Sequence, residues 1–248
     1  MTIKLRHAAI AALFVTTVAS SADLGKMFGA AADVAKAATV SDQDIIEASR
    51  QMMVYEDKQN KLAPSGDKYA KRLAALTAKH TKEDGLTLNF KVYLSPTVNA
   101  FATPDGSVRV YSGLMDLMND DELRGIIGHE IGHAKLGHSA AAMKTAYLAS
   151  AARKAAASSD SAVGAIASSE LGGMFESVLN AQFSQSQETD SDDYGMTFMK
   201  THKYKAAAME SAFRKIAALE NGGDHSVMSS HPDSSARADR MKQKADAK

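Results

Sequence analysis

The sequence predicts an α+β fold that is mainly helical and contains one small sheet of three or four strands. Aromatic residues form 6% of the 248 residues and tryptophan is absent, a composition that favours helices over a β-sandwich. Strand-like alternation is confined to residues 86–111, whereas helical patterns lie on both sides of this stretch. A single HExxH sequence, typical of a metal-binding helix, follows the strands.

The N-terminal residues have the pattern of an export signal. Lys4 and Arg6 give a basic start, the uncharged apolar stretch 8–19 is too short to cross a membrane, and small residues lead to Ala22. We expect cleavage near Ala22 and a periplasmic location; the alternative is an amphipathic first helix of the mature fold. The expected divisions are a signal peptide at 1–22, a mobile segment at 23–40 and one domain at 41–248.

Bulk composition limits the classes of partner. The formal net charge is zero, so neither nucleic acid nor an anionic membrane surface is expected as the main partner. No stretch after the signal has the length and apolarity of a transmembrane segment. Because cysteine is absent, we expect neither a disulfide nor lipid attachment through an N-terminal cysteine.

Two helices are expected before the strands. Ser41 is a candidate N-cap for a helix at 42–60, because its hydroxyl can accept a hydrogen bond from a free amide of the first turn. The Pro-Ser-Gly sequence at 64–66 ends this segment. A second helix is expected at 67–80, with apolar residues on one face.

Three strand-like runs follow a turn at residues 84–85. Leu86–Leu94 alternates apolar and polar residues with a period of two, and Val98–Ala102 is a shorter, mixed run. Val108–Tyr111 follows the Pro-Asp-Gly turn at 104–106, which is typical of a hairpin. These runs predict the small sheet.

The chain after the strands is predicted to be helical. Asn119 precedes three acidic residues, which stabilise the positive end of a helix, so a helix is expected from there to about Leu136, with Gly137 as its C-terminal cap. Further helices are expected at 140–157, at 171–200, at 205–219 and after Pro232.

The HExxH sequence indicates a metal site on the helix that contains it. His129 and His133 lie four residues apart, so both imidazoles face the same side of a helix and can bind one ion. Glu130 is offset by about 100° around the helix and borders the ion without ligating it. Two imidazoles and a nearby carboxylate suit Zn²⁺ with a bound water.

A catalytic zinc site needs a third protein ligand. The longer pattern HExxHxxGxxH is absent, because Leu136 and Ser139 occupy the positions of its glycine and third histidine. His138 is one residue out of that pattern. It follows the expected end of the helix, so we expect it to point away from the metal and to have a structural or surface role.

Acidic residues on a later helix are the other source of a third ligand. Among Glu170, Glu176 and Glu188, the last is favoured because Asp192 lies one turn further along the same face. Asp192 can then accept the spare ring N–H of a bound histidine and fix its tautomer. The alternative is that the acidic run 188–193 is simply a solvated helix face.

Several motifs occur together in the order found in one protein family. They are Asn99-Ala100-Phe101-Ala102, Val110-Tyr111-Ser112-Gly113-Leu114-Met115, the segment 128–133 with Gly137-His138, Phe183-Ser184-Gln185 before Glu188 and Asp192, and His231-Pro232 with Arg237. From about residue 68 to its end, the chain resembles the zinc metallopeptidase family that includes the HtpX protease and the CAAX prenyl endopeptidase. It is most similar to the periplasmic and outer-membrane branch typified by LoiP and BepA.

The resemblance implies a zincin-like metallopeptidase domain with one Zn²⁺ per chain, of the gluzincin type. It implies that His129, His133 and Glu188 bind the ion and that Glu130 is the catalytic base. Relatives in this branch are typically lipoproteins, often with a disulfide, and the lack of cysteine departs from that pattern.

The same resemblance places His231 and Arg237 near the site, as candidates to stabilise the oxyanion that forms during hydrolysis. His231 has two alternative roles, as a fourth zinc ligand in a resting state or as a packing residue at the start of the last helix. Tyr194 is a weaker candidate that we expect to serve in packing.

The segment Asn99-Ala100-Phe101 is expected to form a sheet edge beside the cleft, where an extended substrate can add as a strand. Phe101 is equally well explained as a core aromatic. Recognition through the backbone would select unfolded proteins, so the expected substrates are misfolded or unassembled cell-envelope proteins.

The predicted function is therefore a zinc metalloendopeptidase of protein quality control, with a possible association with outer-membrane assembly machinery. The alternative is a chaperone-like or assembly factor that retains the fold with little proteolysis. A purely structural zinc site is disfavoured, because four closed ligands are then needed and no cysteine can supply them.

Overall fold

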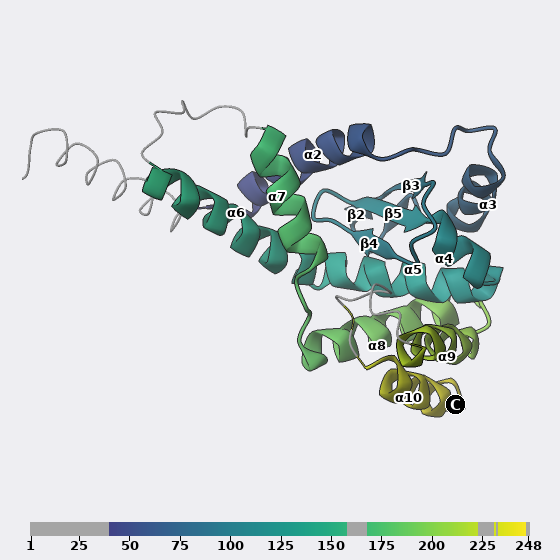
Figure 1. Ribbon diagram of the computed structural model, residues 1–248. Helices are drawn as coiled ribbons and strands as arrows, with labels where there is room; N and C mark the ends of the chain where they lie inside the picture. Colours follow the sequence, from purple (N-terminus) through teal and green to yellow (C-terminus); the bar gives the residue numbers. More distant parts are fainter. Residues whose placement is uncertain (1–39, 158–167, 223–230, 232, 247–248) are drawn as a thin grey trace, which may run out of the picture.

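The computed structural model describes residues 40–157, 168–222, 231 and 233–246 (Figure 1). The expected signal peptide, residues 23–39 and Pro232 lie outside these residues. Within the described part, the mainly helical α+β class is confirmed. No helix in the described ranges combines the length and the apolarity that a membrane crossing requires.

The helices and strands lie close to the expected positions. The helices are α2 (Asp42–Gln59), α3 (Lys68–Thr77), α4 (Ser112–Leu117), α5 (Asp120–Lys135), α6 (His138–Ala157), α7 (Ser168–Leu179), α8 (Gln185–Thr201), α9 (Ala208–Asn221) and α10 (Ser234–Asp246). The strands are β1 (Lys82–Glu83), β2 (Leu86–Thr87), β3 (Asn89–Tyr93), β4 (Ala100–Ala102) and β5 (Ser107–Tyr111).

The main sheet has three strands in the order β3-β5-β4. The central strand β5 is parallel to β3 and antiparallel to β4. The single strand expected at 86–94 is divided, because the chain changes partner at Leu88. The amide of Leu88 donates to the Thr81 carbonyl of the β1–β2 hairpin, whereas the amide of Asn89 donates to the Gly106 carbonyl beside β5.

The helix α5 lies between the sheet and the C-terminal helices α8, α9 and α10 (Figure 1). The larger hydrophobic core fills both interfaces of α5, with Leu123, Ile126, Ile127 and Ile131 all 2% exposed or less. A second apolar cluster joins α2, α6 and α7. The HExxH helix is therefore the buried centre of the domain, which explains why its polar site residues are shielded from water.

Local capping signals explain where several helices begin. Ser41, Asn119 and Ser184 are the N-caps of α2, α5 and α8, and each forms a capping box with the residue three positions later. The prediction of a single helix at 171–200 is therefore wrong. Residues 180–184 are not helical, and Ser184 is the N-cap of a new helix, α8. The helix expected at 205–219 begins later, at the start of α9.

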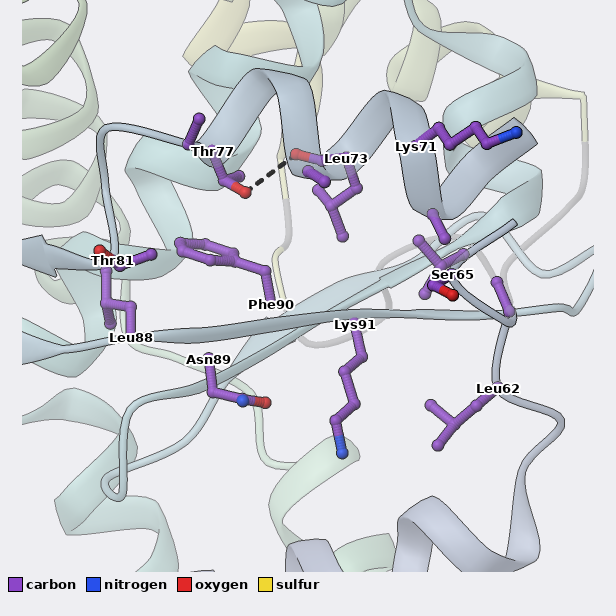
Figure 2. Close-up of a pocket in the computed structure, with 15 residues that line it drawn as sticks. Leu62, Ser65, Lys71, Leu73, Thr77, Thr81, Leu88, Asn89, Phe90 and Lys91 are labelled. Atoms are coloured by element: carbon purple, nitrogen blue, oxygen red, sulfur yellow. Dashed lines mark hydrogen bonds between the residues drawn. The ribbon is translucent and has the colours of Figure 1, made fainter. Parts of the chain in front are cut away.

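The strand β3 separates two environments. A groove of about 740 Å³ lies between β3 and α3, and Figure 2 shows Phe90 directed toward α3 while Lys91 points to the opposite side of the strand. The residues that line this groove include neither the histidines of the HExxH motif nor Glu188. On the other side of β3, the Lys91 ammonium lies 2.6 Å from Asp57 of α2.

The carboxylate of Asp57 holds α2 against the sheet by accepting hydrogen bonds from strand residues. The guanidinium of Arg109, on the central strand, donates to both Asp57 oxygens at 2.8 and 3.0 Å, although the Arg109 side chain is only 2% exposed. The hydroxyl of Tyr93 donates to the same carboxylate at 3.0 Å. Hydrogen bonds from Arg109 and Lys91 outweigh the opposing effect of burial, so the pKa of Asp57 is lowered.

Replacing Asp57 by Ala is expected to lower the free energy of unfolding by about 3–5 kcal/mol, because the Arg109 charge stays buried without its main partner. Urea or guanidinium unfolding followed by circular dichroism measures this change. The control is Glu47→Gln, which removes an exposed ion pair with Arg50 and should cost at most about 1 kcal/mol. Equal costs for the two substitutions would contradict the anchoring role of Asp57.

Candidate metal centre

Four side chains from three parts of the chain bring ligand atoms together. They are His129 and His133 of α5, Glu188 in the first turn of α8, and His231, three residues before α10. One donor atom from each side chain lies within 4.8 Å of the others, and all four residues are buried. The sequence-predicted ligands are thus brought together in space.

The donor atoms face one another at short distances. The two Nε2 atoms of His129 and His133 lie 3.0 Å apart. Glu188 Oε1 lies 3.4 Å from His133 Nε2 and 2.9 Å from His231 Nδ1. The second oxygen of Glu188 lies 3.6 Å from His129 Nε2.

Glycines allow α5 and α8 to approach closely enough for this arrangement. A Cβ atom added to Gly195 of α8 would lie 3.1 Å from the backbone nitrogen of His129. A Cβ atom on Gly132 of α5 would lie 3.2 Å from the backbone of Ser191. Because these contacts involve backbone atoms, a larger residue at either position has to push the helices apart.

Asp192 orients His129. The His129 Nδ1 atom lies 2.9 Å from Asp192 Oδ1, so this nitrogen carries the ring proton and the Nε2 lone pair faces the centre. The guanidinium of Arg237 donates to both Asp192 oxygens, at 3.0 and 2.6 Å, and lies 2.7 Å from Glu188 Oε2. The sequence-based role of Asp192 as a partner of a ligand histidine therefore has the required geometry.

His138 has the corresponding position beside His133. Its Nδ1 atom lies 3.2 Å from His133 Nδ1 and 3.2 Å from the Ser191 hydroxyl. As expected, His138 is not among the four side chains whose donor atoms converge, and its contacts are structural. Its expected direction is wrong, because α6 begins at His138 itself and the ring faces back toward α5. Phe183 stacks on the His133 ring with the ring centroids 3.9 Å apart, a contact that sequence reasoning missed.

The donor set fits a divalent metal ion. When the contacts with Asp192 and His138 hold the ring protons of His129 and His133 on Nδ1, the two Nε2 lone pairs face the same point, 3.0 Å apart, where a cation can bind both. Two imidazoles and a carboxylate are the ligands typical of catalytic zinc sites. In addition, the buried Oε1 atom of Glu130 has no hydrogen-bond partner among the described residues. A polar group such as water beside the ion can satisfy this oxygen.

The electrostatic environment gives Glu130 the properties of a base. Burial raises the pKa of the Glu130 carboxyl to about 7, and the nearby negative charge of Glu188 contributes in the same direction. The backbone N–H of Ala102 donates to this carboxyl and opposes the rise. A carboxyl with a pKa near neutrality can both accept and release a proton at physiological pH.

Burial and neighbouring charges give the candidate ligands the protonation states that metal binding requires. Burial keeps the pKa of His129 well below its ordinary value and lowers that of His133 to about 4, so both rings are neutral at pH 7. Burial alone would raise the pKa of Glu188, but its contacts with the rings of His133 and His231 hold the pKa well below the usual range.

The predicted substrate-binding segment lies on β4 and just before it. Asn99 is buried and its side-chain oxygen accepts a hydrogen bond of 2.8 Å from the Ala100 amide. Phe101 packs against the rings of Tyr93, Tyr111 and Phe175 in the second apolar cluster. Tyr194 donates to Asp84 at 2.6 Å and packs against the larger core.

Known proteins share this sequence over most of its length. Residues 57–245 match the sequence profile of peptidase family M48. The metalloprotease LoiP of Escherichia coli (strain K12) is 36% identical over 248 residues, which cover 100% of this chain and 98% of the relative. The metalloprotease YcaL of the same organism is 39% identical over 208 residues, 84% of this chain and 82% of the relative. The mitochondrial metalloendopeptidase OMA1 of Homo sapiens is 45% identical over 47 residues, 18% of this chain and 9% of the relative.

Replacing His138 by Leu is expected to weaken zinc binding by about 10–100-fold, because His133 loses the acceptor of its Nδ1–H. His138→Asn is the matched control, since its side-chain oxygen can take the place of the ring nitrogen and should preserve most of the affinity. Competition with a chromophoric chelator measures both affinities. Wild-type affinity in His138→Leu would rule out an orienting role for His138.

Proposed function

The chain belongs to peptidase family M48, as its motifs predicted, and we propose that it is a zinc-dependent endopeptidase of the gluzincin type. Family membership makes it a metalloprotease with protein substrates. The finer proposal is carried by one observation, the convergence of His129, His133 and Glu188 beside a buried Glu130 oxygen that lacks a hydrogen-bond partner in the described structure.

In this proposal His129, His133 and Glu188 hold one Zn²⁺ per chain. The bound ion supplies a water of lowered pKa and polarises the carbonyl of the scissile peptide bond. Asp192 and His138 keep the two imidazoles in the orientation and tautomer that binding requires. Phe183 stacks on one face of the His133 ring and supports this orientation.

Glu130 is the proposed general base. It takes a proton from the attacking water and passes the proton to the leaving amine, and a pKa of about 7 suits both steps. His231 is the proposed donor to the oxyanion, because its Nε2 atom lies 3.6 Å from Glu130 and its other nitrogen faces the ligands. The same position also allows His231 to act as a fourth ligand before substrate binds.

Arg237 is better suited to support the ligands than to contact the substrate. Its guanidinium nitrogens face the carboxylates of Glu188 and Asp192, and the group lies 4.2 Å above the ring of Phe213. We therefore assign it the role of neutralising the two acids and fixing their positions. The sequence suggested both Arg237 and His231 as groups that stabilise the oxyanion, and we assign this role to His231 alone.

We also propose that extended substrates bind along β4. This strand is an edge of the sheet, and Ala102 connects it directly to Glu130. The side chain of Asn99 already accepts the Ala100 amide, so an incoming strand has to replace this bond. Phe101 supports the edge from the aromatic cluster behind it.

Recognition of backbone groups requires an unfolded segment and does not depend on a particular side chain. Misfolded or unassembled cell-envelope proteins are therefore the proposed substrates, and the periplasm is the proposed location, in keeping with the signal pattern at residues 1–22. An association with outer-membrane assembly machinery belongs to the same proposal.

Glu130→Gln is expected to lower the rate of casein cleavage by about 10²–10⁴-fold while the zinc content stays unchanged, because the amide cannot accept the water proton. The rate is followed by release of fluorescent peptides from labelled casein. The matched control is Glu176→Gln on the exposed face of α7, which should cleave at the wild-type rate. Cleavage by Glu130→Gln at the rate of the control would disprove the assignment of the base.

A wild-type protein that binds zinc and suppresses aggregation without cleaving casein would instead favour the chaperone-like function.

Glu188→Ala is expected to hold about one zinc equivalent less than the wild type after dialysis against a weak chelator, because the substitution removes the anionic ligand and leaves the Arg237 cation beside the ion without one of its carboxylate partners. Elemental analysis gives the zinc content per chain, and far-ultraviolet circular dichroism checks the fold. Glu176→Ala serves as the control and should keep its zinc. Undiminished zinc in folded Glu188→Ala would exclude Glu188 as the third ligand.

A further inference from the structure

A second group of metal-binding side chains lies at the opposite end of α8. It consists of His80 after α3, Glu83 of β1 and His202, the C-cap of α8. One donor atom from each side chain lies within 4.8 Å of the others. The three residues come from three separate segments and lie outside every motif that the proposed hydrolysis uses.

The carboxylate of Glu83 lies between the two imidazoles. Its Oε2 atom is 2.8 Å from His80 Nδ1, and its Oε1 atom is 3.0 Å from His202 Nε2. The rings of His80 and His202 meet edge to face with their centroids 4.6 Å apart. Two nitrogens and one oxygen therefore surround a small volume, with the same ligand types as the centre on α5.

Tyr204 orients His80 in the way that a metal ligand requires. Its hydroxyl lies 2.8 Å from His80 Nε2, so the ring can place its proton on Nε2 and direct the Nδ1 lone pair at Glu83. The guanidinium of Arg124 lies 4.7 Å above the Tyr204 ring, and Phe198 packs against His80 with ring centroids 4.7 Å apart. These contacts fix the ring of His80, which is only 1% exposed.

Access from solvent is also suitable for an ion. The His202 side chain is 28% exposed and that of Glu83 is 13% exposed. A cation can therefore enter from this side, and water can complete its coordination.

We propose that His80, Glu83 and His202 form a second binding site for a divalent transition-metal ion such as Zn²⁺. Imidazole and carboxylate ligands suit zinc and its neighbours in the first transition series, whereas Ca²⁺ and Mg²⁺ prefer sites built from oxygen alone. Without the ion, the two Glu83 contacts are hydrogen bonds to protonated ring nitrogens. With the ion, each neutral ring carries its proton on the other nitrogen, which for His80 is the Nε2 atom beside the Tyr204 hydroxyl, and the atoms that face Glu83 become ligands.

The site is structural, because it joins the β1–β2 hairpin to the helix that supplies Glu188. The tip of the hairpin already contacts both helices of the catalytic centre. The Lys135 ammonium donates to the Asp84 carbonyl at 2.6 Å, and the Tyr194 hydroxyl donates to the Asp84 carboxylate at 2.6 Å. A metal ion between Glu83 and His202 adds a third connection at the end of α8.

The two centres are separate. Glu188 lies in the first turn of α8 and His202 follows its last turn, so about 20 Å of helix lies between them at a rise of about 1.5 Å per residue. The second site does not need the first to be filled, and its test does not depend on proteolytic activity.

The test is a zinc count on the full chain after metal removal, saturation with zinc and gel filtration, read by elemental analysis. His202→Gln is expected to hold one zinc equivalent less than the wild type, because the amide can still donate to Glu83 but binds zinc poorly. Thr201→Asn, at the exposed neighbouring position, is the matched control and should hold as much zinc as the wild type. A second variant, Glu83→Gln, keeps a side-chain acceptor and should also lose one equivalent.

Thermal unfolding with and without zinc supplies an independent measurement. Zinc should raise the midpoint temperature of unfolding more in the wild type and in Thr201→Asn than in His202→Gln. If His202→Gln and Glu83→Gln both bind as much zinc as the wild type, the second site does not exist and the cluster is a hydrogen-bond network only. Failure of the centre on α5 would lower all four counts equally and leave the difference between them intact.

Discussion

The close approach of α5 and α8 is the constraint on which the proposed catalytic centre depends. Two of the proposed ligands lie on one helix, and the third, Glu188, can reach them only if the neighbouring helix lies almost against the backbone of the first. Gly132 on α5 and Gly195 on α8 make this contact possible, since a side chain at either position would meet backbone atoms at 3.1–3.2 Å. The small residues within and beside the motif are therefore as necessary to the geometry as the ligands themselves.

Charge balance gives a second reason why these side chains can be buried together. Glu130, Glu188 and Asp192 contribute three carboxyl groups, and Arg237 contributes one positive charge. With these four groups ionised and His129, His133 and His231 neutral, the centre carries two net negative charges. Against the effect of burial, Glu130 and Glu188 raise the pKa of His231, so its protonation removes one of these charges. A divalent cation cancels this excess, whereas its absence is partly compensated by the raised pKa of Glu130.

Features set by local sequence could be predicted, whereas those set by distant partners could not. The spacing of His129 and His133 follows from helix geometry alone, and the caps of α2 and α5 follow from their own first turns. The break before α8 could also have been predicted, since Ser184 and Gln187 form a capping box, but residues 171–200 were expected to form one helix. The change of strand partner at Leu88 depends on Thr81 and on β5, and no local pattern records it.

The first turn of α6 shows why sequence spacing was a poor guide to the surroundings of the site. His138 and Ser139 are consecutive, yet they contact different parts of the site. His138 contacts the proposed ligand His133, whereas the Ser139 hydroxyl donates to the Ala102 carbonyl of β4 at 2.8 Å. Ala102 in turn donates its amide to Glu130. One helix turn thus contacts both a proposed ligand, His133, and the strand that holds the proposed base, Glu130. Their relative position is set by the start of α6, directly after Gly137, and the five-residue motif alone does not determine it.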